Sequence, residues 1–169
     1  YPGYGACEGA PSRASIIAAI EAAWPALAKD LGVGVDQLDR DVNTMGFSMG
    51  AAAAMEFAAR RPVKKVVLLA PFTSLHAMAE RQTGGFVAMF LLDRFDNAAR
   101  LDELARRSPP PSVLVCHGTA DQVIPVEMGR ALGTRHPSFT RYREFPGADH
   151  GAIPSVAAPT RSEEHTSEL

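Results

Sequence analysis

The feature that most constrains this chain is a serine between two glycines, in a short segment that joins an expected strand to an expected helix. Residues 46–50 read GFSMG; they close a partly apolar run over 41–47 and lead into an alanine-rich, helix-favouring run. This order predicts a strand, a sharp turn and a helix, with Ser48 at the apex of the turn. A serine in such a turn has a strained backbone, so a side chain at Gly46 or Gly50 would collide with the turn.

The turn by itself allows two interpretations. In the first, Ser48 is a nucleophile that stands above the end of the sheet. The backbone N–H of Met49, at the N-terminus of the following helix, would then point toward a developing oxyanion. In the second, Ser48 is a glycine-flanked serine in an ordinary strand–helix turn. The residues further along the chain favour the first interpretation.

The composition predicts a single globular domain and excludes some classes of partner, but it does not indicate a particular function. The chain has 169 residues, of which 46% are hydrophobic, and this predicts a single domain with one sizeable core. With 17 basic and 19 acidic residues the net charge is −2, so no basic stripe favours nucleic acid or an anionic membrane as a partner. No run approaches the ~18 apolar residues of a membrane span and no signal peptide opens the chain, which leaves the cytoplasm as the default location. The sequence does not fix the oligomeric state.

The two cysteines, Cys7 and Cys116, are far apart and have no metal-type spacing. Cys116 lies inside an apolar run and is expected to be a buried structural thiol. Histidines and carboxylates are not spaced as metal ligands, and there is no glycine-rich phosphate loop. We therefore expect neither a metal nor a cofactor.

Strands and helices alternate along the chain in a way that is typical of a parallel, doubly wound α/β sheet. Strands are expected near residues 41–47, 64–70, 112–116 and 140–145, and helices near 49–60 and 126–135. The strand over 64–70 is apolar enough to be covered on both faces. An earlier helix is expected after a cap at Ser12, and Pro25 should kink or divide it.

A serine hydroxyl is a poor nucleophile at neutral pH, so it needs an imidazole as base and a carboxylate to orient that imidazole. In an open α/β sheet these groups come from loops at the carboxyl ends of strands. Asp121 lies in the loop after the strand over 112–116, and His150 lies in the loop after the strand over 140–145. The sequence therefore offers Ser48, Asp121 and His150 as a triad, in that order.

Other residues of the same types have alternative interpretations. Asp93 and Asp96 are weaker candidates for the acid. Asp149 is expected to shape its loop, and His117 to stabilise a turn. His76 and His136 fall on or next to helices and should be solvated or packed, while Ser74 should cap a helix.

Three motifs in this order resemble the α/β-hydrolase fold family: GFSMG at 46–50, HGTADQVIP at 117–125 and ADHG at 148–151. The opening YPGYG and the APFTS at 70–74 are also similar to compact serine hydrolases related to serine aminopeptidases and BEM46-like proteins. The resemblance covers residues 1–160. It implies a nucleophile at position 48, and since that residue is serine, the dehalogenase branch with its aspartate nucleophile is disfavoured.

The same resemblance implies what would lie upstream of Tyr1. In the family, the second oxyanion donor comes from a loop after an earlier strand, and that strand pairs with the one that carries the nucleophile. We therefore expect the strand over 41–47 to be an open, apolar edge of the sheet. On this reading residues 1–160 are a partial α/β-hydrolase domain that lacks its N-terminal strands.

The implied activity is acyl transfer to Ser48, with His150 as general base and acid, Asp121 as its orienting carboxylate and Met49 N–H as one oxyanion donor. The substrate would be a small molecule with an ester, thioester or amide bond, or a short peptide. The connection between the strands at 64–70 and 112–116 leaves room for a small helical cover, and the apolar residues at 86–92 are expected to be core or part of a small cover over a pocket. The alternative is a non-catalytic member of the fold that serves as a binding or scaffold module.

The last nine residues, 161–169, do not fit the pattern of the rest of the chain. They resemble the translation of a common sequencing adapter read through in frame. We expect a cloning or assembly scar, and we leave it out of the prediction of the fold.

Overall fold

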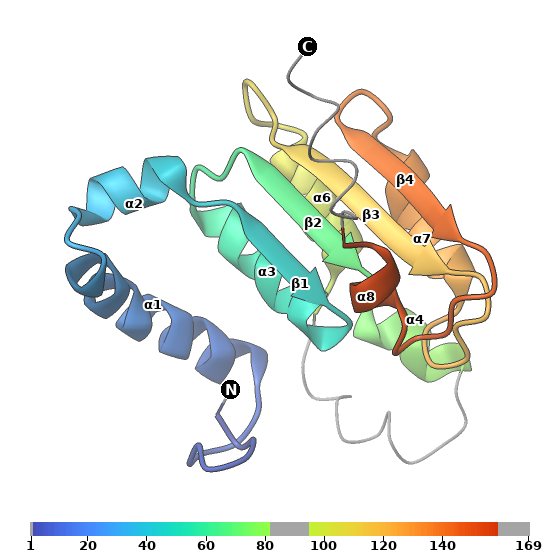
Figure 1. Ribbon diagram of the computed structural model, residues 1–169, viewed down its shortest axis with the longest axis horizontal. Coiled ribbons are helices and arrows are strands. Elements are labelled where there is room, and N and C mark those ends of the chain that lie inside the picture. The colour runs from blue at the N-terminus through green and yellow to red at the C-terminus, as the bar shows by residue number, and fades with distance from the viewer. Residues whose placement is uncertain (1, 82–94, 159–169) are drawn as a thin grey trace.

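The computed structural model describes residues 2–81 and 95–158. Within these residues a parallel sheet is flanked by helices (Figure 1). Its elements are α1 (Arg13–Asp30), α2 (Val35–Asp41), β1 (Thr44–Phe47), α3 (Met49–Arg60), β2 (Lys65–Leu69), α4 (Leu75–Arg81), α6 (Asn97–Leu104), β3 (Ser112–Gly118), α7 (Val126–Arg135), β4 (Thr140–Phe145) and α8 (Ile153–Val156). No helix in this part of the chain is both long and apolar enough to cross a membrane.

The four strands lie in the order β1-β2-β3-β4, and each pair of neighbours is parallel. Their carboxyl ends therefore point to one end of the sheet, as the arrowheads in Figure 1 show. The expected α/β architecture is confirmed. The loop after each strand opens at the same end, so residues far apart in the sequence meet there.

The main core lies between the sheet and the helices α3, α6 and α7. Val66 and Leu68 of β2 and Val113 and Val115 of β3 point into it, since alternate residues of a strand share a face. The alanine-rich run of α3, residues 51–54, is buried and lets this helix approach the sheet closely. On the opposite face Cys116 packs with Ile153 of α8, and the expected buried thiol is confirmed.

The expectation that the strand over 64–70 is covered on both faces holds only in part. On the helix-packed face Val66 and Leu68 are buried, whereas on the other face Leu69 is buried but Val67 is only half-buried. Within the described residues, α8 is the helix that contacts β3 on that second face, and it has only four residues. A short helix cannot cover a sheet as fully as α3 and α7 do.

Two local expectations about the first part of the chain were wrong or incomplete. Pro25 does not divide the first helix, because α1 runs continuously from Arg13 to Asp30. Proline has no N–H to donate to the carbonyl four residues earlier, that of Glu21. Glu21, Pro25 and their neighbours Ala22 and Ala26 are exposed, so water can bind this carbonyl. The short helix α2 was not predicted, and the strand begins only at Thr44.

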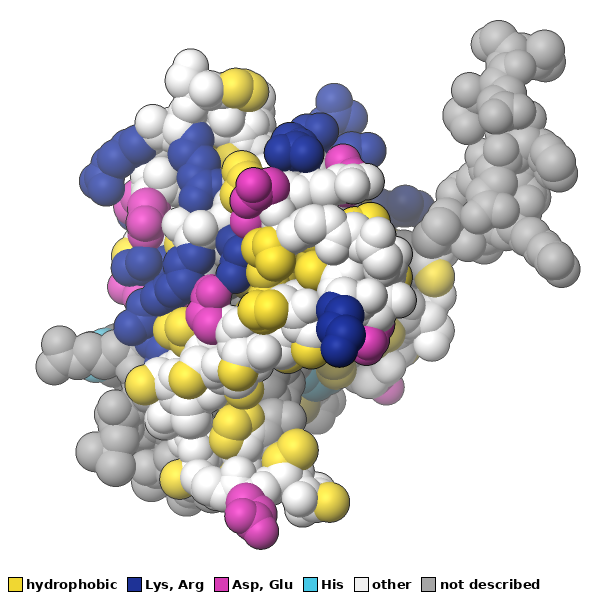
Figure 2. Space-filling view, turned by 90° about the vertical axis from the view of Figure 1, so that its left-hand side faces the viewer, with side chains coloured by type: hydrophobic (Ala, Val, Ile, Leu, Met, Phe, Trp, Pro, Cys, Tyr) yellow, Lys and Arg dark blue, Asp and Glu magenta, His cyan; other side chains and the backbone are white. Residues whose placement is uncertain are grey.

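The strand β1 forms the edge of the four-stranded sheet, as expected, and the side chain of Met45 is 70% exposed there. A groove of about 310 Å³ runs along this edge; it is lined by Ile20, Trp24, Val42, Asn43, Thr44, Met45, Gly50, Ala53, Ala54 and Phe57. Figure 2, seen from the side of α1 and α2, shows hydrophobic side chains gathered through the middle of this face.

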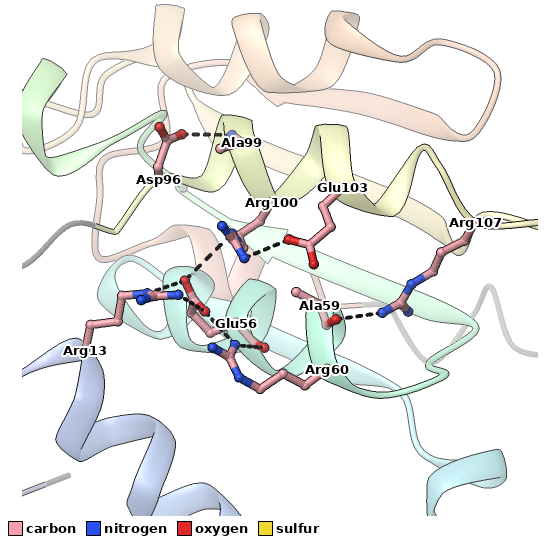
Figure 3. A network of polar contacts seen from close by, with 9 residues as sticks. All are labelled: Arg13, Glu56, Ala59, Arg60, Asp96, Ala99, Arg100, Glu103 and Arg107. Carbon is pink, nitrogen blue, oxygen red and sulfur yellow. Dashed lines mark hydrogen bonds and ion pairs between the residues drawn. The ribbon is translucent and has the colours of Figure 1, made fainter.

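A buried carboxylate joins α1 to α3 and α6. Glu56 of α3 accepts hydrogen bonds from Arg13 at 2.7 and 2.8 Å and from Arg60 at 2.6 Å, and its side chain is only 2% exposed. The guanidinium of Arg100 lies 4.0 Å away on α6 (Figure 3). Burial acts to raise the pKa of Glu56, but the hydrogen bonds and charges of Arg13 and Arg60 hold this pKa below its ordinary value.

Candidate active site

Ser48 stands at the junction of β1 and α3 with a strained backbone. Its φ is 54° and its ψ is −120°, a region that residues other than glycine rarely occupy. The turn is held by two backbone hydrogen bonds. Ser48 N–H donates to Leu69 O at 2.9 Å, and Ala51 N–H donates to Ser48 O at 3.0 Å. The local geometry is that of a nucleophile elbow, in which the sharp turn lifts the serine above the sheet.

Gly46 makes this turn possible. A Cβ atom at Gly46 would lie 2.0 Å from the carbonyl oxygen of Gly50 and 2.6 Å from Ala51 N, far inside van der Waals contact. The obstacle is the backbone of α3, which cannot move aside as a flexible side chain would. The expected need for glycine at position 46 thus has a direct steric cause.

Met49 is the first residue of α3, which continues to Arg60. The N–H groups in the first turn of a helix have no partner within the helix, so they can donate to a group outside it. The N–H of Met49 directly follows Ser48 in the chain. It is therefore a suitable donor to a negative oxygen that forms beside the serine hydroxyl.

Asp121 lies just after β3, and its side chain is fully buried. Its Oδ1 accepts hydrogen bonds from the backbone N–H groups of Val123 at 2.9 Å and Ile124 at 2.8 Å. These bonds fix the plane of the carboxylate and leave Oδ2 directed toward two imidazoles. The loop that sequence reasoning assigned to the acid is therefore folded around the carboxylate.

The structure brings His150 to this carboxylate. His150 Nδ1 lies 2.7 Å from Asp121 Oδ2, although 29 residues separate the two in the sequence. Because an ionised carboxylate only accepts hydrogen bonds, Nδ1 carries a hydrogen, and in the neutral form of the ring Nε2 is then the acceptor. The side chain of His150 is 17% exposed, so the ring stays open to the surface. This tautomer is the one that a general base needs.

Within the described residues, the connection between Ser48 and His150 is a packing contact made by Phe47, the residue before Ser48. The ring of Phe47 packs against the ring of His150, with 4.7 Å between the ring centroids. Phe47 directly precedes Ser48, so this contact brings the imidazole to the elbow. No hydrogen bond joins Ser48 Oγ to His150 within the described residues. Such bonds are often long without a substrate and tighten when one binds.

The loops that carry Asp121 and His150 are bonded to each other. Ala120 N–H donates to Ala148 O at 3.0 Å, and Gly147 N–H donates to Thr119 Oγ1 at 2.8 Å. A Cβ atom at Gly118 would lie 2.2 Å from Ala148 O, so glycine permits this close approach. We name this set of contacts the loop clamp. It holds the acid and the imidazole in one rigid unit.

Sequence reasoning missed the contact of His117 with the acid. His117 is fully buried at the end of β3, and its Nε2 lies 2.9 Å from Ile124 O and 3.2 Å from Asp121 Oδ2. The expectation of a turn-stabilising histidine describes only the bond to Ile124. A signal was present: a histidine that continues a buried strand needs a polar partner, and Asp121 is the nearest carboxylate in the sequence.

The other candidates lie away from the elbow or have structural roles. Asp96 caps α6 by accepting from Ala99 N–H at 2.8 Å, and Asp149 accepts from Ala152 N–H at 2.9 Å. Ser12 and Ser74 cap helices, as expected. His76 is exposed and His136 bonds to Asp102. Asp93 and the expected cover at 86–92 lie outside the described residues.

A cavity of about 870 Å³ lies at the opposite end of the sheet, where β2 and β3 begin. Its lining includes Arg60, Arg61 and Arg107, but these cations already bond to Glu56, Asp39 and backbone carbonyls. This cavity therefore lies at the other end of the sheet from Ser48 and His150. We assign the candidate active site to the strained serine and the imidazole paired with Asp121, because these groups have the geometry that catalysis needs. No group of three or more histidine, cysteine or acidic side chains in the described part of the chain is arranged to hold a metal ion.

The parallel sheet and the strained elbow between β1 and α3 define the class: the chain has the α/β-hydrolase fold. The chain is 35% identical over 153 residues to human alpha/beta hydrolase domain-containing protein 17B. That alignment covers 90% of the chain and 49% of the human protein, so the chain spans about half the length of this relative. No protein-family model matches the chain.

Solved structures agree on the fold. A monoacylglycerol lipase from Paleococcus ferrophilus superposes with a TM-score of 0.51 at 20% identity, over 89% of this chain and 72% of the lipase. An alpha-beta serine hydrolase homologue from Coxiella burnetii also gives 0.51, at 17% identity, over 92% of this chain and 62% of the homologue. At such low identity these similarities establish the fold alone.

Proposed function

We propose that this chain is the catalytic core of a serine hydrolase that transfers an acyl group from a small ester, thioester or amide to Ser48 and then to water. One observation carries the proposal. The imidazole of His150 is hydrogen-bonded to the buried Asp121 and packs against Phe47, which directly precedes the strained Ser48. The similarity to a hydrolase-domain relative supports the same class of reaction.

In the proposed reaction, Ser48 Oγ attacks the carbonyl carbon of the substrate while His150 Nε2 takes the hydroxyl proton. The N–H of Met49 donates to the oxyanion that forms on the carbonyl oxygen. His150 then gives its proton to the leaving group as the bond to that group breaks, and an acyl-serine remains. Water repeats these steps, so that the acid product leaves and Ser48 regains its proton.

Asp121 acts by stabilising the charged imidazole. The positive charge that forms on His150 lies next to a carboxylate with no cation among its hydrogen-bond partners in the described residues. Esters and thioesters come before amides in our proposal because their leaving groups need less help from the protonated imidazole.

The test is labelling of the 169-residue chain with a fluorophosphonate probe, which reacts with activated serines. We expect the parent chain and Ser155→Ala to be labelled and Ser48→Ala to remain unlabelled; Ser155 is an exposed serine of α8. Circular dichroism of each sample shows whether it is folded. If the folded parent chain is not labelled, the test is repeated with the upstream segment restored, because the second oxyanion donor is expected there. A folded, extended chain that the probe still does not label would refute the proposal and favour a non-catalytic binding module.

A further inference from the structure

The carboxylate of Asp121 is bonded by more donors than a triad requires. Its Oδ1 accepts from two backbone N–H groups, and its Oδ2 faces two imidazoles, His150 at 2.7 Å and His117 at 3.2 Å. The second imidazole is not part of the reaction described above. It is fully buried and does not reach the surface where a substrate would bind.

The partners of His117 fix which of its nitrogens carries the hydrogen. Nε2 lies 2.9 Å from the carbonyl oxygen of Ile124, which can only accept, so Nε2 carries the hydrogen. The same nitrogen also lies 3.2 Å from Asp121 Oδ2, close enough for its N–H to interact with the carboxylate as well. The other nitrogen, Nδ1, is buried and has no hydrogen-bond partner in the described residues.

The ring of His117 is also held in place by α7. A Cβ atom at Gly129 of that helix would lie 2.4 Å from His117 Nδ1, so glycine lets the helix backbone lie directly against the ring. Such close packing leaves the ring little freedom to turn away from Asp121. An unpaired buried nitrogen costs free energy, so this arrangement needs a compensating role.

Burial also keeps His117 neutral. Loss of solvent lowers the pKa of His117 below its ordinary value, and this effect outweighs the hydrogen bond that His117 donates to Ile124 O and the nearby charge of Asp121. A neutral donor can hold a carboxylate in place without cancelling its charge. The full negative charge of Asp121 then remains available to the imidazolium that forms at His150.

Resting on the function proposed above, we propose that His117 is a positioning residue that acts through Asp121. Its Nε2–H holds Oδ2 in the plane where that oxygen meets His150 Nδ1. Without this donor, Asp121 keeps its two bonds at Oδ1, and Oδ2 is held by His150 alone, so the carboxylate is less firmly fixed in its plane. His150 would then lose the alignment with Ser48 that proton transfer requires.

Substitution of His117 by glutamine or asparagine distinguishes a role as hydrogen-bond donor to Asp121 from a role in packing alone. The amide nitrogen of glutamine reaches about as far from the backbone as histidine Nε2, whereas that of asparagine reaches only about as far as Nδ1. His117→Gln therefore keeps a donor near Asp121, and His117→Asn removes it but retains a polar side chain. His117→Leu removes every donor.

We expect kcat for an activated ester to fall about 10- to 100-fold in His117→Asn and His117→Leu, with little change in KM, because a small misalignment of a base slows chemistry and leaves binding intact. His117→Gln should recover most of this loss. Melting temperatures and circular dichroism are measured on every variant. Equal losses in the glutamine and asparagine variants, or losses that follow the fraction of folded protein, would overturn the proposal.

A second measurement does not depend on activity. We expect the proton between His150 Nδ1 and Asp121 Oδ2 to give a strongly downfield NMR signal in the folded chain, because the two atoms lie 2.7 Å apart. We expect His117→Gln to keep this signal near its original position, and His117→Asn to shift or broaden it. If the parent chain has no hydrolase activity but the signal behaves in this way, the proposed function fails while the positioning role stands. An unchanged signal in His117→Asn would overturn the positioning role.

Discussion

Two buried carboxylates show opposite ways of keeping a negative charge inside this protein. Asp121, at the candidate active site, has a fully buried side chain and is bonded by backbone N–H groups and two imidazoles. Glu56, at the junction of three helices, is 2% exposed and is bonded by the guanidinium groups of Arg13 and Arg60. The partners of the first carboxylate are backbone amides and imidazoles, and the partners of the second are permanent cations.

The difference matches the separate roles of the two carboxylates, one that joins helices and one that is proposed to stabilise a transient cation. Arginine is charged at any accessible pH, so the partners of Glu56 cancel its charge at all times and fix α1, α3 and α6 to one another. Asp121 is surrounded by donors that stabilise an anion without neutralising it. Its charge is therefore free to interact with a cation that exists only for part of a reaction cycle.

The largest effect is expected at Asp121. Asp121→Asn places an NH2 group where Nδ1–H of His150 now donates, so the imidazole turns to the wrong tautomer. For a Ser-His-Asp triad this costs about 10⁴-fold in kcat. Steady-state hydrolysis of an activated ester measures the loss. A loss below tenfold in a folded variant would contradict the role assigned to Asp121.

Glu56→Gln should instead reduce stability and leave the activity of the folded molecules unchanged. It leaves two guanidinium groups facing a neutral amide. Removing one partner of a buried ion pair is strongly destabilising, and since Arg13 and Arg60 are 32% and 34% exposed, we expect only about 2–3 kcal/mol. Urea unfolding measures the free energy.

Arg100→Ala is the matched control for Glu56→Gln. Its guanidinium lies 4.0 Å from Glu56 and its side chain is 29% exposed, so the cost should be below about 1 kcal/mol. If Arg100→Ala destabilises the chain as much as Glu56→Gln does, the carboxylate is not the centre of the network in Figure 3.

The smallest effect is expected in the pH dependence of stability. The pKa of Glu56 is lowered in the folded state, so the unfolded state binds more protons near and below pH 4.5, the ordinary value. The stability that Glu56 contributes is therefore present above this pH and is lost as the pH falls through the lowered pKa. The unfolding free energy of Glu56→Gln should fall less steeply there than that of the parent chain.

His117 acts in a different range of pH. Its pKa is lowered from an ordinary value of 6.5, so the unfolded state takes up a proton that the folded state excludes as the pH falls below 6.5. His117→Gln should remove this part of the acid destabilisation and leave the part due to Glu56. Identical pH profiles for the two variants would contradict the separation of the two carboxylate sites.

The sequence predicted most of the fold because its strong signals are local. GFSMG at 46–50 and the apolar runs that became β2 and β3 specify strands and turns through their own residues. The misses have physical causes. The helix α2 has seven residues and a single buried side chain, Leu38, so it has almost no apolar periodicity. The helix α1 continues through Pro25, where the neighbouring residues on that side are exposed and water can bind the carbonyl that loses its partner.

Most of the candidate site could also be predicted from the sequence. The positions of Asp121 and His150 after neighbouring strands follow from the topology of a parallel sheet, and the structure brings them into contact. The contact of His117 with Asp121 depends on how far β3 extends, which its composition does not fix. The catalytic roles of Ser48, Asp121 and His150 remain a prediction that the labelling experiment tests.

The loop clamp also bears on how such a chain can change over generations. Its bond from Ala120 N–H to Ala148 O joins main-chain atoms, as does the neighbouring bond from Thr119 N–H to Phe145 O, and nearly any residue can supply a main-chain N–H or C=O. Point substitutions at Ala120 or Pro146 should therefore be well tolerated. A one-residue insertion in either loop would shift every later donor past its acceptor. Selection would therefore act more on the lengths of these two loops than on the residue types within them.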